Sequence, residues 1–226
     1  MLKIDFWGVE LLIVVCVLIP WFAVRSRRRL VARGLPISRP VFFWQSIITQ
    51  VVLYGLALVA AARNEIILRL VPRMPARSLV ALALLAAAVA LLHLRWRSRL
   101  PEEKQRLYAI LPHDRKELLP YVLLCSVAAV SEEVVYRGAG PRLFLRQGFS
   151  VAVAVTLMAL AFAAAHALQG WRSAAAIFLI ALAFHGVVIY CNALLPAIAV
   201  HFAYDIYAGV MISRWMRGET EVARLT

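Results

Sequence analysis

The sequence has few charged residues and very few cysteines for its length. Only 16% of the 226 residues are Asp, Glu, Lys or Arg, against about 25% in soluble domains. Hydrophobic residues make up 63% of the chain, and the mean hydropathy is +0.80. Three cysteines are too few for a disulfide framework. The composition excludes a disordered chain, argues against a soluble globule, and predicts an integral membrane protein of all-α class.

Acidic residues are the scarcer of the two charged classes. Twelve Asp and Glu stand against 25 Lys and Arg, which gives a net charge of +13. On so apolar a chain, we interpret the excess as positive charge at the edges of membrane spans rather than as a nucleic-acid-binding surface. We therefore expect membrane lipids as partners, and no nucleic acid.

Seven apolar stretches are predicted to cross the membrane, for which a helix needs about 20 residues. They are long and continuous, whereas the strands of a membrane β-barrel alternate between apolar and polar residues, so a helical bundle is favoured. The third stretch is short, and the seventh contains polar residues. The predicted spans are 6–24, 41–62, 79–94, 118–136, 150–168, 174–190 and 194–215.

Basic residues around these stretches predict the orientation of the chain. Arg25, Arg27, Arg28 and Arg29 directly follow the first stretch, which is typical of a cytoplasmic anchor rather than a cleaved signal peptide. Under the positive-inside rule the N-terminus then lies outside and, after seven spans, the C-terminus lies in the cytoplasm. On this topology about two thirds of the basic residues lie on the inner side.

The polar residues divide the chain into two parts. A charged segment at 95–117 separates a region of three spans (1–117) from a four-span block (118–226) that we predict to be the catalytic core. The first three spans contain almost no polar residues apart from Glu10, Gln45, Gln50 and His93. An ionisable side chain at the centre of a span costs about 2.5–3.5 kcal/mol and therefore needs a partner or a purpose. We expect the chemistry in the second block, where such residues gather.

Two adjacent glutamates lie near the end of the fourth predicted span. Glu133 and Arg137 are four residues apart, on one face of a helix, and are expected to form an ion pair. Glu132 is turned by about 100° from Glu133 and has no local partner. Because two carboxylates exceed what one arginine needs, we predict that Glu132 reacts and that Glu133 and Arg137 support it. The alternative is that both acids only bind Arg137.

Two histidines and an aspartate lie in the fifth and seventh predicted spans. His166 ends an alanine-rich stretch, and His201 and Asp205 are four residues apart on one helix face. Asp205 could hold the His201 ring in one tautomer or act directly on a substrate. A glutamate with two histidines is typical of a site that activates water, in which the imidazoles bind a metal or polarise a carbonyl group. The zinc-protease pattern HExxH is absent. We interpret the other histidines as structural residues, namely His93, His113 and His185. For His185 the alternative is that it joins the site from the sixth predicted span.

Three short motifs in this order resemble a known family. Residues 132–137 fit EExxxR, residues 162–166 fit FxxxH and residues 201–205 fit HxxxN/D, each on a separate apolar helix. Together they look like the CAAX-protease and bacteriocin-processing family of intramembrane proteases (CPBP, also called Abi), in particular the type II CAAX prenyl endopeptidases. The resemblance covers roughly 118–215.

The resemblance implies an intramembrane endopeptidase in a bacterial inner or plasma membrane, acting on a membrane-tethered or lipidated protein or peptide. Glu132 would activate water with His166 as its partner, while His201 and Asp205 would bind the oxyanion or complete the water site. The family more often has Asn where this chain has Asp205, and an anionic Asp cannot donate a hydrogen bond. Either a divalent metal such as zinc, held by Glu132, His166 and His201, or a metal-independent glutamate mechanism would fit.

Two other functions compete with this hypothesis. Intramembrane acids and histidines also mark ion pathways, so an ion- or proton-coupled transporter is the first alternative. The second is a non-catalytic membrane immunity or scaffold protein that keeps the site only as a binding cavity. The EExxxR spacing favours the protease over a transporter, because a transporter gives no reason for it.

Overall fold

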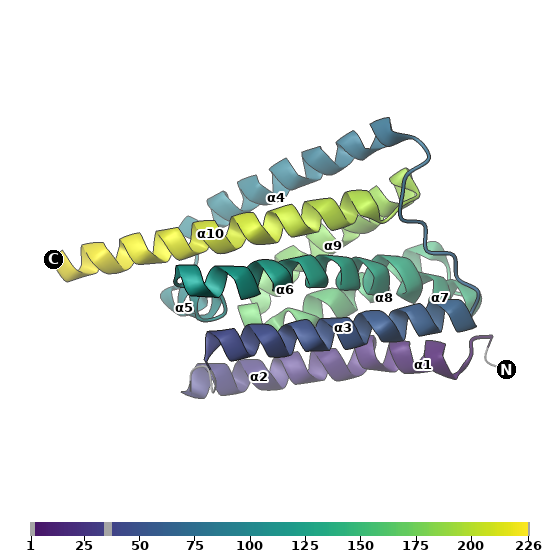
Figure 1. Cartoon of the computed structure of the whole chain (residues 1–226), viewed down its shortest axis with the longest axis horizontal. Helices are drawn as coiled ribbons and strands as arrows, with labels where there is room; N and C mark the ends of the chain where they lie inside the picture. Colours follow the sequence, from purple (N-terminus) through teal and green to yellow (C-terminus); the bar gives the residue numbers. More distant parts are fainter. Residues whose placement is uncertain (1–2, 34–37, 226) are drawn as a thin grey trace.

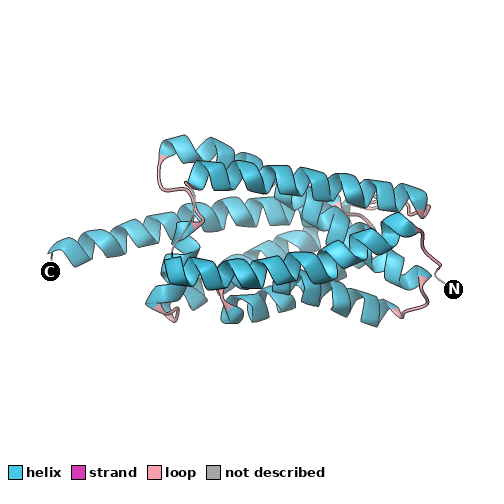
Figure 2. Ribbon diagram, turned by 90° about the horizontal axis from the view of Figure 1, so that it is seen from below, coloured by secondary structure: helices cyan, strands magenta, loops and turns pink. Residues whose placement is uncertain are grey.

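The chain folds into a bundle of helices that run along one long axis. The computed structural model describes residues 3–33 and 38–225, and in these two segments every regular element is a helix (Figure 2). The predicted all-α class is therefore confirmed. The α-helices are α1 (Phe6–Ile13), α2 (Ile19–Arg33), α3 (Arg39–Arg63), α4 (Leu79–Arg97), α5 (Pro101–Ala109), α6 (Arg115–Glu133), α7 (Gly140–Arg146), α8 (Val151–Ala165), α9 (Trp171–Cys191) and α10 (Leu195–Leu225).

Six helices in the described part of the chain are long and apolar enough to cross a membrane. These six make the chain an integral membrane protein with several spans. When the shorter helix α8 is counted with these six, successive helices run in alternating directions, and the two termini lie at opposite ends of the bundle (Figure 1). The six candidate spans are Phe6–Leu30, Arg39–Arg63, Pro75–Trp96, Arg115–Arg146, Trp171–Cys191 and Leu195–Glu219.

The fifth predicted span, 150–168, is shorter than expected. Helix α8 has 15 residues, about 22 Å at 1.5 Å per residue, against a hydrocarbon core of about 30 Å. It ends because His166 leaves the helical conformation, a short 3₁₀ turn (Ala167–Gln169) follows, and Gly170 has φ 102°. Only glycine adopts that conformation readily. The predicted span 150–168 is therefore too long at its C-terminal end, because the apolar run continues past the point where the backbone turns.

Helix α6 carries the two glutamates and is continuous with a π-helical segment. The side chain of Asp114 caps the start of α6 by accepting hydrogen bonds from the backbone N–H groups of Lys116 and Glu117. Directly after Glu133 the helix widens into the π-helical segment Val134–Ala139, all of which is buried. Such π-helical turns occur mostly as single bulges within α-helices and frequently at functional sites. The glutamate pair thus lies at a change in helix geometry in the centre of the bundle.

The three N-terminal spans pack closely against the C-terminal four-helix block. Helix α3 lies along α6, α2 contacts α8, and α4 contacts α10. Buried residues of α1, α3, α8, α9, α10 and the π-helical segment Val134–Ala139 belong to one hydrophobic cluster, which includes Leu11, Ala57, Val135 and Met158. The two parts predicted from the sequence therefore share a core, and α3 is placed to reach the residues of α6.

Candidate active site

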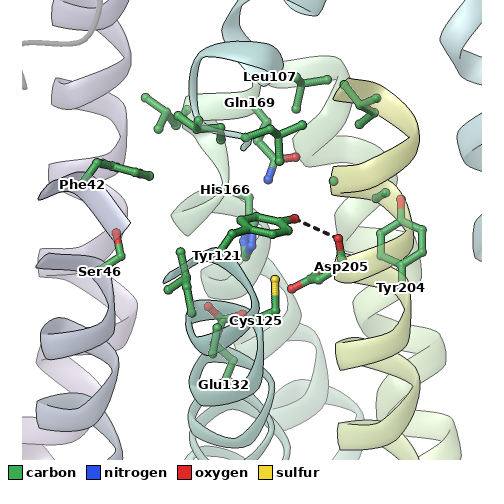
Figure 3. Close-up of a pocket in the computed structure, with 18 of the residues that line it drawn as sticks. Phe42, Ser46, Leu107, Tyr121, Cys125, Glu132, His166, Gln169, Tyr204 and Asp205 are labelled. Carbon is green, nitrogen blue, oxygen red and sulfur yellow. Dashed lines mark hydrogen bonds between the residues drawn. The ribbon is translucent and has the colours of Figure 1, made fainter. Parts of the chain in front are cut away.

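A cavity of about 300 Å³ lies between α3, α6, the end of α8 and α10. Glu132, His166 and Asp205 line it from three of these helices (Figure 3). Gln50 lines it from α3, and much of the remaining lining is apolar. The cavity thus brings polar groups from distant parts of the sequence to one space within the bundle.

Glu132 extends from the last turn of α6 toward this cavity. Its side chain is only 12% exposed. Oε1 accepts a hydrogen bond of 2.6 Å from Gln50 Nε2, and Oε2 lies 3.6 Å from His201 Nε2. The carboxylate therefore has one oxygen bound by an amide and the other facing an imidazole, and it remains in contact with the cavity.

Glu133 points to a different set of partners, as its rotation from Glu132 predicts. Oε1 lies 3.2 Å from Arg137 Nη1 and accepts a hydrogen bond of 2.9 Å from His201 Nδ1. The side chains of Glu133 and Arg137 are 0% and 1% exposed. The expected ion pair between them is present, and the guanidinium lies over the rings of Phe162 and Phe184 at 4.2 Å and 5.2 Å. Aromatic faces thus share in stabilising a buried cation.

His201 lies between three carboxylates. Since a carboxylate only accepts, His201 Nδ1 carries the hydrogen that Glu133 binds. Nε2 lies 3.4 Å from Asp205 Oδ2 and 3.6 Å from Glu132 Oε2. The residue that holds Nδ1 is therefore Glu133, whereas the sequence suggested Asp205 for orienting the ring. Asp205 faces the other nitrogen, and its side chain is 31% exposed.

His166 ends α8 and has one nitrogen bound to the backbone. Nδ1 lies 2.8 Å from the carbonyl oxygen of Phe162, which can only accept, so Nδ1 carries a hydrogen. This leaves Nε2 for other partners. His166 and Asp205 also line a second, smaller cavity of about 80 Å³ together with His201, Glu133 and Arg137. The structure thus places all six predicted site residues around two neighbouring spaces.

The expected metal ligands do not form a metal site in this arrangement. Across residues 3–33 and 38–225, no group of three or more His, Cys, Asp or Glu side chains lies close enough together to hold an ion. The hydrogen bonds at His201 Nδ1 and His166 Nδ1 leave the Nε2 atom of each ring available, but the three side chains do not form such a group as they stand. The mechanism proposed for this site therefore uses protein groups alone.

Sequence reasoning missed two residues of the cavity. Gln50 stood out as one of the few polar residues of the N-terminal spans, but its partner Glu132 lies 82 positions away. Tyr121, at the opposite end of α6 from the glutamates, donates a hydrogen bond of 2.8 Å to the backbone carbonyl of Asp205, as Figure 3 shows. Contacts of this kind depend on which helices are neighbours, and the sequence pattern does not contain that information.

The remaining histidines lie away from the glutamate pair. His93 pairs with Tyr207, and His113 stacks on Tyr108. His185 is buried and lines a separate cavity together with Arg137. None of the three lines the cavity that Glu132 faces.

The comparisons with known proteins match one part of this bundle to a family. Residues 114–207 match the family model described as type II CAAX prenyl endopeptidase Rce1-like. We call this segment the Rce1-like domain because of its similarity to that family. No curated protein and no solved structure matches the chain. The Rce1-like domain extends from the cap of α6 to the middle of α10 and contains all three motifs, while α1 to α5 lie outside it.

Proposed function

We propose that this protein is an intramembrane endopeptidase that hydrolyses a peptide bond of a membrane-tethered or lipidated protein. The observation that carries the proposal is Glu132: a carboxylate at a cavity within the bundle, 3.6 Å from His201 Nε2. The Rce1-like domain supports a protease, since it makes a protein substrate the expected partner. A single carboxylate beside an imidazole is a typical arrangement for general base catalysis on water.

In the proposed first step Glu132 takes a proton from a water molecule. The water oxygen attacks the carbonyl carbon of the peptide bond, and the electron pair of the C=O bond moves to the carbonyl oxygen. The resulting oxyanion is stabilised by the Nε2–H of protonated His201, which Glu133 holds through Nδ1. In the second step the C=O bond forms again and the C–N bond breaks.

The leaving nitrogen must gain a proton as the C–N bond breaks. His166 Nε2 carries no hydrogen in the neutral ring, because Nδ1–H is bound to the carbonyl of Phe162. We assign His166 the transfer of this proton from Glu132 to the leaving nitrogen. Glu132 and His166 then return to their starting states. The products are a carboxylic acid and an amine, and water supplies all the added atoms.

The test is cleavage by purified protein in liposomes, with a membrane-tethered peptide that ends in a prenylated CAAX sequence. In H₂¹⁸O one ¹⁸O atom should enter the newly formed carboxyl group. Glu132→Gln should lower kcat by about 10²–10⁴-fold, the usual contribution of a general base. Glu102→Gln, an exposed glutamate on α5, is the matched control and should cleave at the wild-type rate. Wild-type cleavage by Glu132→Gln would overturn the proposal.

We further infer that the N-terminus lies outside and the C-terminus in the cytoplasm. Opposite locations require an odd number of crossings, so the short helix α8 would have to count as one of seven. The positive-inside rule supports this orientation, because the clusters at 25–29 and 95–117 fall on the side assigned to the cytoplasm. Reporter fusions at the two termini should report opposite compartments. Signals from the same compartment would contradict this topology.

A further inference from the structure

Gln50 is a polar residue in a long apolar helix, and its side chain is turned into the bundle. It is partly buried, while its neighbours Val51 and Val52 are exposed on the membrane-facing surface of α3. Placing an amide among apolar groups is costly unless its hydrogen bonds are formed. Its position beside Glu132, rather than at a helix end, suggests that the amide acts on that carboxylate.

Two hydrogen bonds fix the position of Gln50 against α6. Its Nε2 donates to Glu132 Oε1 at 2.6 Å, and Ser131 Oγ donates to the backbone carbonyl of Gln50 at 3.0 Å. Because a carboxylate accepts and never donates, the nitrogen of the amide must face Glu132. The bond to Glu132 therefore distinguishes the nitrogen of the Gln50 amide from its oxygen. The amide oxygen is not the atom that contacts Glu132 Oε1.

The amide oxygen of Gln50 is a buried acceptor without a donor. Within the described residues, Gln50 Oε1 has no hydrogen-bond partner and almost no accessible surface. Buried polar groups in native proteins nearly always have a partner, which is often an ordered water. Gln50 and Glu132 both line the cavity of about 300 Å³. An acceptor lacking a donor beside the proposed base marks a place for a hydrogen-bond donor, such as a water, next to Glu132.

We propose that Gln50 is a catalytic residue that holds the attacking water together with Glu132. One O–H of the water donates to Gln50 Oε1, and the other donates to Glu132, which takes that proton. The lone pair of the water oxygen is then directed away from both acceptors, into the cavity where a peptide carbonyl would lie. Meanwhile Gln50 Nε2–H keeps the carboxylate in one rotamer. The inference rests on the proposed function and deepens it.

This role also assigns a task to the N-terminal spans. Gln50 lies on α3, outside the Rce1-like domain at 114–207. The domain supplies Glu132, His166 and His201, and α3 supplies the second water ligand. The active site would then be incomplete without the part of the chain that the family match leaves out.

The first test replaces Gln50 by a residue of similar length without an amide. Gln50→Met should lower kcat by about 10- to 100-fold, the value of a hydrogen bond to a charged or reacting group, and leave KM within about twofold. The acidic limb of its kcat pH profile should move to higher pH, because the carboxylate loses a donor. Gln45→Met, on an exposed position of the same helix, is the control and should leave both properties unchanged.

Gln50→Glu gives a second, independent readout. At neutral pH two adjacent carboxylates repel each other, so this variant should be nearly inactive. At lower pH one carboxyl is protonated and donates to the other, so part of the activity should return. If Gln50 had only a structural role, the activity of Gln50→Glu would not recover at low pH. This second variant keeps the inference testable even if Gln50→Met does not fold.

The outcomes separate this inference from the proposed function. If Gln50→Met and Gln50→Glu both keep wild-type kcat and pH profile while Glu132→Gln is inactive, the water-binding role of Gln50 is overturned and the protease remains. If Glu132→Gln is also fully active, the proposed function falls as well. Loss of kcat in Gln50→Met with recovery of Gln50→Glu at low pH supports the inference.

Discussion

Glu133 accepts a hydrogen bond of 2.9 Å from His201 Nδ1 through the same oxygen that lies 3.2 Å from Arg137. One buried carboxylate thus links the three motifs. Glu133 belongs to EExxxR and contacts His201 of HxxxN/D directly, while its partner Arg137 lies against Phe162 of FxxxH. The contact explains why two adjacent glutamates are useful in this fold. Glu133 positions the imidazole, and Glu132 is left free to face the cavity.

The first prediction separates the two glutamates by stability. Glu133→Leu should destabilise the protein by about 3–5 kcal/mol, because it leaves the buried charge of Arg137 without its counter-charge. The double variant Glu133→Leu with Arg137→Met should recover most of this stability, since apolar replacement of a buried ion pair is often neutral. Activity should stay lost in both. Unfolding in detergent and peptide cleavage measure the two effects.

Glu132→Gln is the matched control for that series. Its free energy of unfolding should lie within about 1 kcal/mol of the wild-type value, because Gln50 can still donate a hydrogen bond to an amide oxygen at the same place. A large loss of stability in this variant, or none in Glu133→Leu, would contradict the division of labour between the two residues.

The second prediction concerns the free nitrogen of His166. His166→Asn keeps a side-chain donor near the carbonyl of Phe162 and a residue type tolerated at helix ends, but it has no nitrogen at the place of Nε2. If His166 carries a proton, His166→Asn and His166→Ala should both lose about 10²–10⁴-fold in kcat. Near-normal cleavage by His166→Asn would show that the ring only terminates α8.

The third prediction concerns Asp205, where the resembling family more often has Asn. Asp205 Oδ2 lies 3.4 Å from His201 Nε2. Asp205→Asn keeps an acceptor for this nitrogen and adds a donor for an oxyanion, so kcat should stay within about tenfold of the wild type. Asp205→Leu removes both and should lose at least about 100-fold. Equal kcat values for the Asn and Leu variants would exclude a polar role for Asp205.

Most of the fold could be predicted from the sequence, because each long helix corresponds to a local run of apolar residues. Six of the seven predicted spans correspond to long apolar helices. The helical spacing of Glu132, Glu133 and Arg137 likewise predicted which acid would pair with the arginine, because the i,i+4 relation is local. Helix α8 was misjudged, since hydrophobicity alone does not show that Gly170 reverses the chain.

Contacts between distant helices could not be predicted in the same way. Gln50 bonds to Glu132 only because α3 packs along α6 in a particular register, and the sequence carries no local sign of that register. The same holds for Glu133 and His201, which come from α6 and α10. The chemistry of the site could be named from residue types, whereas the partner of each atom required the tertiary structure.

The fourth prediction is a pH dependence of stability outside the membrane spans. His113 lies in the loop before α6, where its ring stacks on Tyr108 at 3.6 Å between centroids. Burial is the main cause that lowers the pKa of His113 from its usual value, and the nearby Arg39 and Arg217 lower it further. The hydrogen bond to the Tyr108 carbonyl and the charge of Glu117 oppose the shift without reversing it.

The sign of the effect follows from proton binding. Between the lowered pKa of folded His113 and its unfolded value of about 6.5, the unfolded chain binds more protons, so stability rises with pH. The contribution is fully present above the unfolded pKa and is lost as the pH falls through it. His113→Phe keeps an aromatic ring on Tyr108 but cannot titrate. Between pH 7.5 and 5.5 its Tm should therefore fall less than that of the wild type, and parallel falls would contradict the assignment to His113.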